Sequence, residues 1–300
     1  MTYDNYRIAQ YAQLAMILEV CATPKPGNVD RDHNYPDTRF EHFLASAVSV
    51  YPVLEQASQD QGGIGGYIHK AVIESSKWQK GGNTHFGAFM LLIPLVMAAG
   101  KLVNKSGSTS YIFPELERRT LELVQNTTVE DAVEIYKAFS VAGVKVKDVS
   151  DLDLRDPASI ETIRSKGTTL FELMEISSSY DMIAREWTSG YLLTFECADS
   201  ILAKKRTMNI NDAVVWSFLE ILSKNPDTFI QIKLDVHTAQ KVSDRAKSII
   251  GSIDRTGFDG AKEDLRAFDE ELIRDGINPG STADIMIAGL FAALMGGLEV

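Results

Sequence analysis

The chain has 300 residues, of which 45% are hydrophobic and 24% charged, a balance typical of a globular protein with a large buried core. Its formal net charge of −11 argues against a general nucleic-acid binder, because such proteins carry a basic surface. It does not argue against nucleotides, since a few local Lys and Arg side chains suffice to hold a triphosphate.

The two cysteines, Cys21 and Cys197, lie far apart and fit no zinc-ligand spacing. Both occur in apolar helical patterns, which predicts buried free thiols in a reducing cytosol. The first residues contain no apolar signal core, and the longest apolar run, 86–99, is too short to span a bilayer and contains Pro94. We therefore expect a cytoplasmic protein without a membrane span.

Apolar residues recur at helical spacing along most of the chain, and no run of alternating β-branched residues, P-loop or Rossmann fingerprint is found. Segment 144–157 is polar and predicts a loop. The sequence therefore predicts an all-α fold, with residues 1–300 in a single multi-helix domain around the apolar helix 86–99. The predicted helices cover residues 3–21, 39–56, 67–78, 86–99, 115–125, 128–142, 168–178, 182–204, 210–224, 234–250, 260–275 and 281–298.

The first break in this pattern, residues 23–31, reads TPKPGNVDR. Its two prolines fix φ on both sides of Lys25 and remove two backbone donors, which predicts a stiff, non-helical loop. A rigid loop carrying Lys25, Asp30 and Arg31 suits a phosphorylated ligand, because less conformational entropy is lost on binding. Taken alone, the segment is also consistent with an ordinary helix-ending turn.

Two further polar breaks, 80–85 and 278–284, each precede a strongly apolar helix. Free backbone N–H groups and the helix dipole favour an anion at such helix starts. Structural capping by Asn83, Thr84 or Ser281 is the alternative at each break. Because caps seldom carry Lys, Asp and Arg together, the three breaks jointly predict a polar pocket at helix ends.

The residues at these breaks resemble a known family. The segment TPKPGNVD, preceded by Glu19, resembles the signature of the triphosphoribosyl-dephospho-CoA synthase family. The segment GNTHFGA from Gly82 resembles that family's Asn-Thr-His-Lys-Gly motif, and NPGSTAD from Asn278 resembles its C-terminal Ser-Pro-Gly-Gly-Ser-Ala-Asp motif. The three motifs agree in order and in rough spacing from one end of the chain to the other.

The resemblance implies an all-α pentosyltransferase in which the 2′-hydroxyl of dephospho-CoA attacks C1 of the ATP ribose and adenine leaves. The transferred sugar keeps its triphosphate, and the product is a prosthetic-group precursor. Displacement at an anomeric carbon passes through an oxocarbenium-like state and calls for carboxylates, one to accept the hydroxyl proton and one acid to protonate adenine. The candidate catalytic residues are Glu19, Asp30 and Asp284.

The remaining site residues follow from the charge of the substrates. We expect Lys25 and Arg31 to hold the triphosphate, together with Mg²⁺ bound by Asp30 and Asp37. The further candidates for sugar or phosphate binding, all at the starts of apolar helices, are Asn83, Thr84, His85, Gly280 and Ser281.

The chain departs from the family pattern at several positions. Phe86 replaces the Lys that follows the motif histidine, and residues 32–38 replace a Gly-Ala-His-x-Asp-Met segment. Segment 185–190 is the nearest counterpart of a Gly-Ala-Arg-Gly-Glu motif. These changes leave three alternatives: the same transfer to another acceptor, Mg²⁺-dependent hydrolysis of the N-glycosidic bond, and a nucleotide-binding regulatory protein. Small residues in 283–296 permit close helix packing within the chain or in a homodimer.

Overall fold

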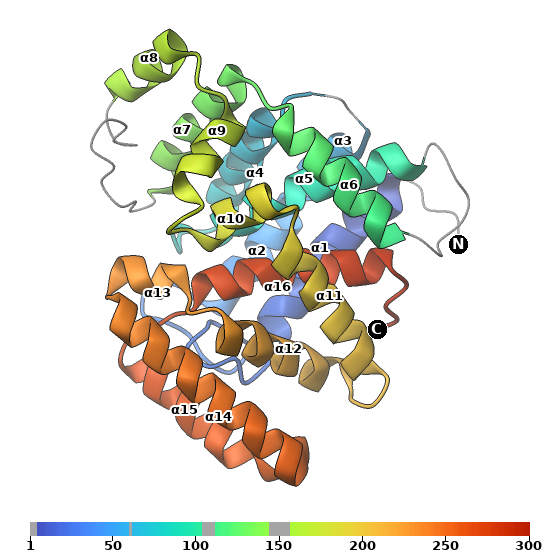
Figure 1. Cartoon of the computed structure of the whole chain (residues 1–300), viewed down its shortest axis with the longest axis vertical. Coiled ribbons are helices and arrows are strands. Elements are labelled where there is room, and N and C mark those ends of the chain that lie inside the picture. The colour runs from blue at the N-terminus through green and yellow to red at the C-terminus, as the bar shows by residue number, and fades with distance from the viewer. Residues whose placement is uncertain (1–4, 60–61, 104–111, 144–156) are drawn as a thin grey trace.

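The computed structural model describes residues 5–59, 62–103, 112–143 and 157–300. Within these ranges the chain forms α-helices and no strand, which confirms the predicted all-α class (Figure 1). The helices of the first half are α1 (Asn5–Cys21), α2 (Phe40–Ser49), α3 (Tyr51–Gln59), α4 (Ile64–Trp78), α5 (Phe86–Val103), α6 (Ile112–Gln125) and α7 (Val129–Ala142). Those of the second half are α8 (Pro157–Lys166), α9 (Leu170–Ser177), α10 (Met182–Ser189), α11 (Leu192–Lys205), α12 (Ile210–Lys224), α13 (Thr228–Lys233), α14 (Val236–Gly260), α15 (Lys262–Arg274) and α16 (Gly280–Met295).

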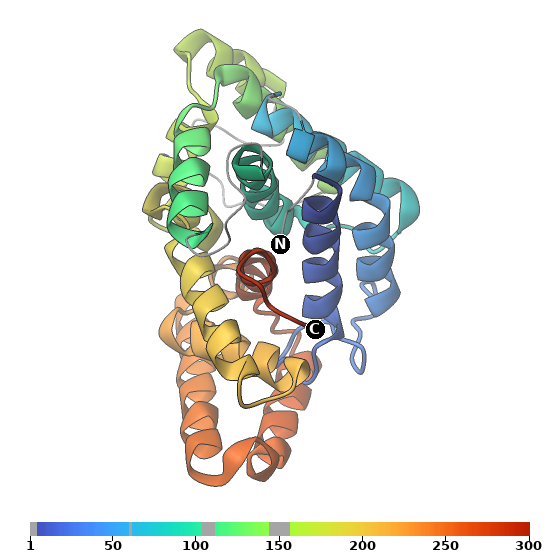
Figure 2. The same cartoon turned by 90° about the vertical axis from the view of Figure 1, so that its right-hand side faces the viewer.

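Two apolar helices, α5 and α16, lie at the centre of the molecule, and other helices surround them (Figure 2). Helix α5 was expected there, since it is apolar on every face. Helix α16 is as deeply buried and packs against α1, α5 and α11. Its small residues serve this packing, because a Cβ atom on Gly289 would overlap Cys197 of α11. The close helix contact anticipated from the small residues is therefore made within the chain.

Two of the predicted helices are each divided in the structure. Segment 39–56 becomes α2 and α3, because Pro52 cannot donate a hydrogen bond to the carbonyl of Val48 and disfavours helical geometry in the residue before it. Segment 182–204 becomes α10 and α11, because Gly190 and Tyr191 both adopt the left-handed conformation, with φ of 75° and 66°.

Other boundaries also differ from the prediction. Helix α4 begins at Ile64, before the expected residue 67. Helix α14 continues beyond the expected end at 250 and is kinked at Gly257, whose φ of 77° and ψ of 170° are not helical. The short α13 was not predicted, since six residues give too little periodicity to detect. The predicted loop 144–157 falls, except for Pro157, outside the described residues.

The helices and the two cysteines bear on the expectations of no membrane span and of buried free thiols. No helix in the described part of the chain is long and apolar enough to cross a membrane. Both cysteines are free thiols, and Cys197 is buried as expected, whereas Cys21 is only partly buried at the end of α1.

Candidate active site

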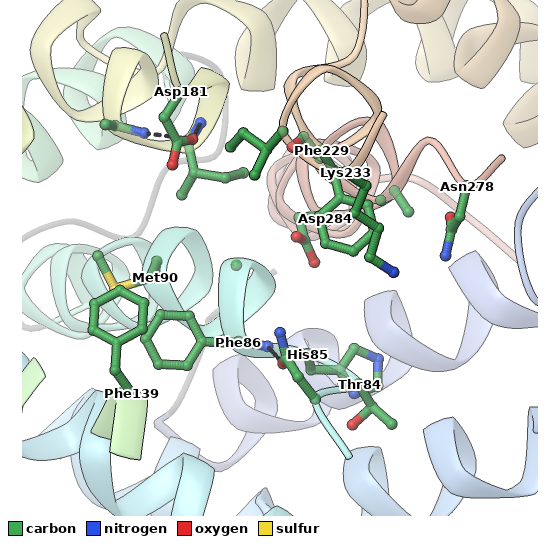
Figure 3. A pocket seen from close by; sticks show the side chains of 18 of the residues that line it. Thr84, His85, Phe86, Met90, Phe139, Asp181, Phe229, Lys233, Asn278 and Asp284 are labelled. Atoms are coloured by element: carbon green, nitrogen blue, oxygen red, sulfur yellow. Dashed lines mark hydrogen bonds between the residues drawn. The ribbon is translucent and has the colours of Figure 1, made fainter. Parts of the chain in front are cut away.

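A cavity of about 380 Å³ opens where the ends of several helices meet. Its walls come from α1, α2, α5, α7, α9, α10, α13 and α16, from the loop that follows α1, and from the segments that precede α5, α10 and α16. One part is apolar and includes Phe86, Met90 and Phe139, and the other is polar and includes Thr84 and Asn278 (Figure 3). The predicted polar pocket at helix ends therefore exists, and it continues into an apolar compartment.

Asp284 lies between these two compartments, near the start of α16 (Figure 3). Its carboxylate accepts a hydrogen bond from the backbone N–H of Ala88, at the start of α5. The starts of the two central helices thus meet at this side chain. Burial raises the pKa of Asp284 well above its usual range, and the nearby Glu19, Asp227 and Asp181 raise it further.

Two other carboxylates line the same cavity. Asp181 caps α10 by accepting hydrogen bonds from the backbone N–H groups of Ile183 (2.8 Å) and Ala184 (3.5 Å), and burial raises its pKa. Glu19, near the end of α1, is ion-paired with Lys25. Burial raises the pKa of Glu19, and Lys25 opposes this rise. Asp284, Asp181 and Glu19 thus form an acidic group around one space.

The loop after α1 is held by its own hydrogen bonds, as the stiff proline-containing motif predicted. Oδ2 of Asp30 accepts from the backbone N–H of Lys25 (3.2 Å), and Oδ1 accepts from those of Asp32 (2.8 Å) and His33 (3.0 Å). Gly27 has a φ of 75°, and a Cβ atom there would overlap the carbonyl oxygen of Ile277. The loop therefore has a defined shape and a close backbone contact with the segment before α16.

The structure separates the residues predicted for this loop into different places. Lys25 is fully buried between Glu19 and Asn28, and neither Lys25 nor Asp30 lines the cavity. Arg31 is exposed, with Nη2 3.3 Å from Oδ1 of Asn211. Asp37 is exposed at the cavity wall.

The second and third motifs do meet at the cavity. Asn83, Thr84 and His85 line one side, and Gly280, Ser281 and Asp284 line the other. Asn83 caps α5, since its Oδ1 accepts from the N–H of Phe86 (2.9 Å). The hydroxyl of Ser281 is 3.2 Å from Oγ1 of Thr228, which ties the start of α16 to α13.

His85 is buried at the inner end of this wall. Ser75 donates a hydrogen bond to Oγ of Ser46 (2.7 Å), and Oγ of Ser46 is 2.8 Å from Nδ1 of His85. Since Ser46 accepts from Ser75, its own proton can be donated to Nδ1, which leaves the imidazole proton on Nε2. Burial, with a smaller contribution from Lys25, lowers the pKa of His85 to about 3, so the ring is neutral at physiological pH.

Several residues of this region were missed by sequence reasoning. Asn28 joins the first and third motifs, because it accepts from Nζ of Lys25 (3.2 Å) and donates to Oδ1 of Asn278 (3.1 Å). Lys233 of α13 carries the one ammonium group among the described cavity-lining residues, and its Nζ lies 4.4 Å from the ring centre of Phe229. Asp181 was also missed.

Two buried acids support the walls without lining the cavity. Asp227 accepts hydrogen bonds from the backbone N–H and hydroxyl of Thr282, both at 2.7 Å, and from two N–H groups of α13. Glu186, in the suggested counterpart of the Gly-Ala-Arg-Gly-Glu motif, accepts from the N–H groups of Leu193 (3.0 Å) and Thr194 (2.7 Å) and so caps α11. Asp227 therefore positions the start of α16, whereas Glu186 has a capping role.

These features define an all-helical protein with an acidic cavity at the ends of its central helices. The chain belongs to the ATP:dephospho-CoA triphosphoribosyl transferase family, whose model matches residues 5–299. This membership confirms the family resemblance of the three motifs and the predicted class of enzyme, a pentosyltransferase.

Individual relatives agree with this assignment. The chain is 22% identical to the 2-(5''-triphosphoribosyl)-3'-dephosphocoenzyme-A synthase of Haemophilus ducreyi, over 96% of this chain and 88% of the relative. It is 25% identical to the synthase of that name from Klebsiella pneumoniae, over 95% and 89%. A crystal structure from Archaeoglobus fulgidus, assigned to the triphosphoribosyl-dephospho-CoA synthases, aligns with a TM-score of 0.66 and 27% identity over 85% of this chain and 99% of that one.

Proposed function

We propose that this chain transfers the triphosphoribosyl group of ATP to the 2′-hydroxyl of 3′-dephospho-CoA and releases adenine. Family membership supports the reaction, and the position of Asp284 between an apolar and a polar compartment supports its location. ATP has the same division, with an apolar base on one side of the ribose and a charged triphosphate on the other. Bound across Asp284, the ribose C1 would lie close to this carboxyl group.

The apolar compartment suits the adenine ring. Phe86 and Phe139 stack with their ring centres 4.5 Å apart and their planes tilted by 30°. Flat apolar surfaces of this kind favour stacking with a heteroaromatic base. The replacement of the usual family lysine by Phe86 therefore adds to the surface that we assign to the base.

The polar compartment suits the triphosphate. Lys233 supplies a cation, and the start of α16 lines the cavity at Gly280 and Ser281, where the positive end of the helix dipole favours an anion. Thr84 adds a hydroxyl group with no hydrogen-bond partner among the described residues. We assign the triphosphate to these groups instead of Lys25, because the ammonium group of Lys25 is buried in its pair with Glu19.

The reaction requires one proton to be accepted and one to be donated. The acceptor oxygen forms a bond to C1, its hydroxyl proton passes to a carboxylate, and the bond from C1 to the adenine nitrogen breaks as adenine takes a proton. Asp284 is suited to donate that proton, because its raised pKa favours the protonated acid. We assign the hydroxyl proton to Glu19, which Lys25 stabilises as an anion.

The charge of the cavity supports a role for Mg²⁺. Glu19, Asp37, Asp181 and Asp284 line it together with the single ammonium group of Lys233, so a bound triphosphate would meet excess negative charge. Carboxylate and phosphate oxygens are the ligands that Mg²⁺ prefers. We propose that Asp37 and the phosphate oxygens hold Mg²⁺, where the ion would offset the phosphate charge. Asp30, the other metal ligand expected from the sequence, does not line the cavity. Equilibrium binding of ATP should be tighter with Mg²⁺ than without it, and equal affinity would contradict this assignment.

Product analysis tests the proposed transfer. The protein is incubated with ATP and Mg²⁺, with and without dephospho-CoA, and adenine is measured by chromatography. We expect adenine release only with dephospho-CoA, one adenine for each acceptor consumed. Release without acceptor would instead indicate hydrolysis of the N-glycosidic bond, and absence of release in both samples would contradict the proposal.

A further inference from the structure

A second polar cluster lies outside the cavity, where the loop after α1 meets α15. It consists of Asp30 and His33 from the loop and Asp269 from the helix. One ligand-type atom from each residue lies within 4.8 Å of the other two. Nδ1 of His33 is 2.8 Å from Oδ2 of Asp269 and 3.8 Å from Oδ1 of Asp30.

The short contact between His33 and Asp269 does not have the geometry of a hydrogen bond. Nδ1 of His33 and Oδ2 of Asp269 are both buried atoms without a hydrogen-bond partner, although they lie 2.8 Å apart. The Asp269 side chain is fully buried, so water does not solvate this oxygen. An imidazole nitrogen and a carboxylate oxygen that lie this close without a hydrogen bond between them are typical of two ligands of one metal ion.

The carboxyl groups of the cluster are held in place by hydrogen bonds from backbone N–H groups. Oδ1 of Asp269 accepts from the backbone N–H of Gly27 (3.0 Å), which leaves Oδ2 directed at His33. Asp30 is held by three backbone N–H groups of its own loop. Such supporting hydrogen bonds orient the ligands of metal sites in proteins.

The charge around the cluster also favours a cation. Asp30, Asp269 and the neighbouring Glu19 are all buried, whereas Lys25 is the buried ammonium group in this part of the structure and is paired with Glu19. Buried carboxylates are stabilised by a paired cation or by a metal ion. A divalent ion would balance Asp30 and Asp269, and the imidazole could bind it as a neutral ligand.

We propose that Asp30, His33 and Asp269 bind a divalent transition-metal ion such as Zn²⁺, Mn²⁺ or Co²⁺, with water completing the coordination. The imidazole nitrogen favours these ions over Mg²⁺, which prefers oxygen ligands alone. His33 is 31% exposed, which gives the ion a path from solvent. The ion links the loop to α15, and Tyr35 of this loop lines the cavity, so the ion stabilises one cavity wall. This site is separate from the Mg²⁺ proposed with ATP and does not depend on the proposed function.

Titration of chelator-treated protein with Co²⁺ tests the site, because the visible absorption of Co²⁺ reports its coordination. We expect one equivalent to bind to the wild-type chain and thermal stability to rise. Asp269→Asn and His33→Ala should each weaken binding at least about 10–100-fold, the effect of losing even an outer-shell partner. His237→Ala, which removes an exposed histidine next to α14's cap, serves as the matched control and should bind normally.

A further variant separates this site from the cavity. Asp284→Asn should leave Co²⁺ binding unchanged. Loss of Co²⁺ binding in the Asp284→Asn protein would place the ion in the cavity and overturn the proposal. Absence of stoichiometric binding to the wild-type chain at micromolar Co²⁺, Zn²⁺ and Mn²⁺ would also overturn it. The wild-type result decides the question even if a ligand variant fails to fold, and circular dichroism identifies that case.

Discussion

The carboxylate of Asp284 lies so close to Gly87 that a Cβ atom on Gly87 would overlap Oδ2 of Asp284. Gly87 is in the first turn of α5, and Asp284 lies just after the first turn of α16. The glycine therefore makes room for the side chain on which the proposed chemistry depends.

Gly87→Ala should reduce activity much more than stability. The added methyl group displaces the end of a flexible side chain, so we expect unfolding free energy to change by no more than about 1 kcal/mol. A misplacement of about 1 Å can lower rates about 10²-fold, and we expect a loss of kcat of that order. Steady-state adenine release and chemical denaturation measure the two effects.

Gly66→Ala in α4 is the matched control, because a Cβ atom there would meet no atom within 4 Å. It should keep wild-type kcat and raise stability by up to about 1 kcal/mol, the usual gain of Ala over Gly in a helix. Wild-type kcat in a folded Gly87→Ala protein would show that catalysis does not need the observed position of Asp284.

Lys25→Met should act mainly on stability. The substitution leaves Glu19 without its cation in a buried position, and breaking a buried ion pair costs about 3–5 kcal/mol. Adding Glu19→Gln should recover part of the loss, because it removes the uncompensated charge. Urea denaturation of the single and double variants measures this.

The exposed pair of Lys77 and Glu74 provides the comparison for Lys25. Lys77→Met should cost less than about 1 kcal/mol, because solvent screens that pair. A Lys25→Met protein with normal stability but a greatly raised KM for ATP would instead support the sequence-based assignment of Lys25 to the triphosphate.

Lys233→Ala should weaken the use of ATP specifically. Loss of a charge-assisted contact of about 1.5–3 kcal/mol corresponds to a roughly 10–100-fold rise in KM for ATP. The KM for dephospho-CoA should change much less. Lys241→Ala removes an exposed lysine from α14 and should leave both constants unchanged. Equal effects of the two substitutions would contradict the assignment of Lys233.

The lowered pKa of His85 predicts that the stability of the folded chain depends on pH. Its pKa is about 3 in the folded chain, below the ordinary value of 6.5, so under acid conditions the unfolded chain binds a proton that the folded chain does not. The contribution of the neutral His85 to the free energy of unfolding is therefore fully present above pH 6.5. It decreases as the pH falls, by about 2 kcal/mol between pH 7 and pH 5.

Denaturation of His85→Gln at both pH values measures this contribution. The variant should lose less stability than the wild-type chain over that interval, whereas His237→Gln, at an exposed position, should follow the wild-type chain. Identical losses in wild type and His85→Gln would contradict a neutral buried imidazole.

The all-α class and most helices could be predicted, because apolar periodicity is a local property of the sequence. The division at Gly190 and Tyr191 could not, since a tyrosine in the left-handed conformation has no reliable sequence signal. The length of α14 was also missed, because Gly251 resembles a helix end but lies within the helix. Local patterns thus identify the helices better than their boundaries.

The site could be predicted only in part, for a similar reason. The motifs identified Glu19 and Asp284, because unusual polar residues next to apolar helices are visible in the sequence. Lys233 lies on the short α13 and Asp269 on the amphipathic α15, where charged residues are expected at the surface. Only the folded chain brings them to the cavity and the loop. Burial, which separates Lys25 from the cavity, likewise depends on the tertiary fold.

Single-turnover adenine release by Asp284→Asn, with saturating ATP, Mg²⁺ and dephospho-CoA, tests the central assignment most directly. The asparagine keeps the size of the side chain but cannot donate the carboxyl proton. We expect the rate to fall about 10²–10⁴-fold, the usual contribution of general acid–base catalysis, while ATP binding changes little. Release at the wild-type rate would contradict the role of Asp284 in the transfer.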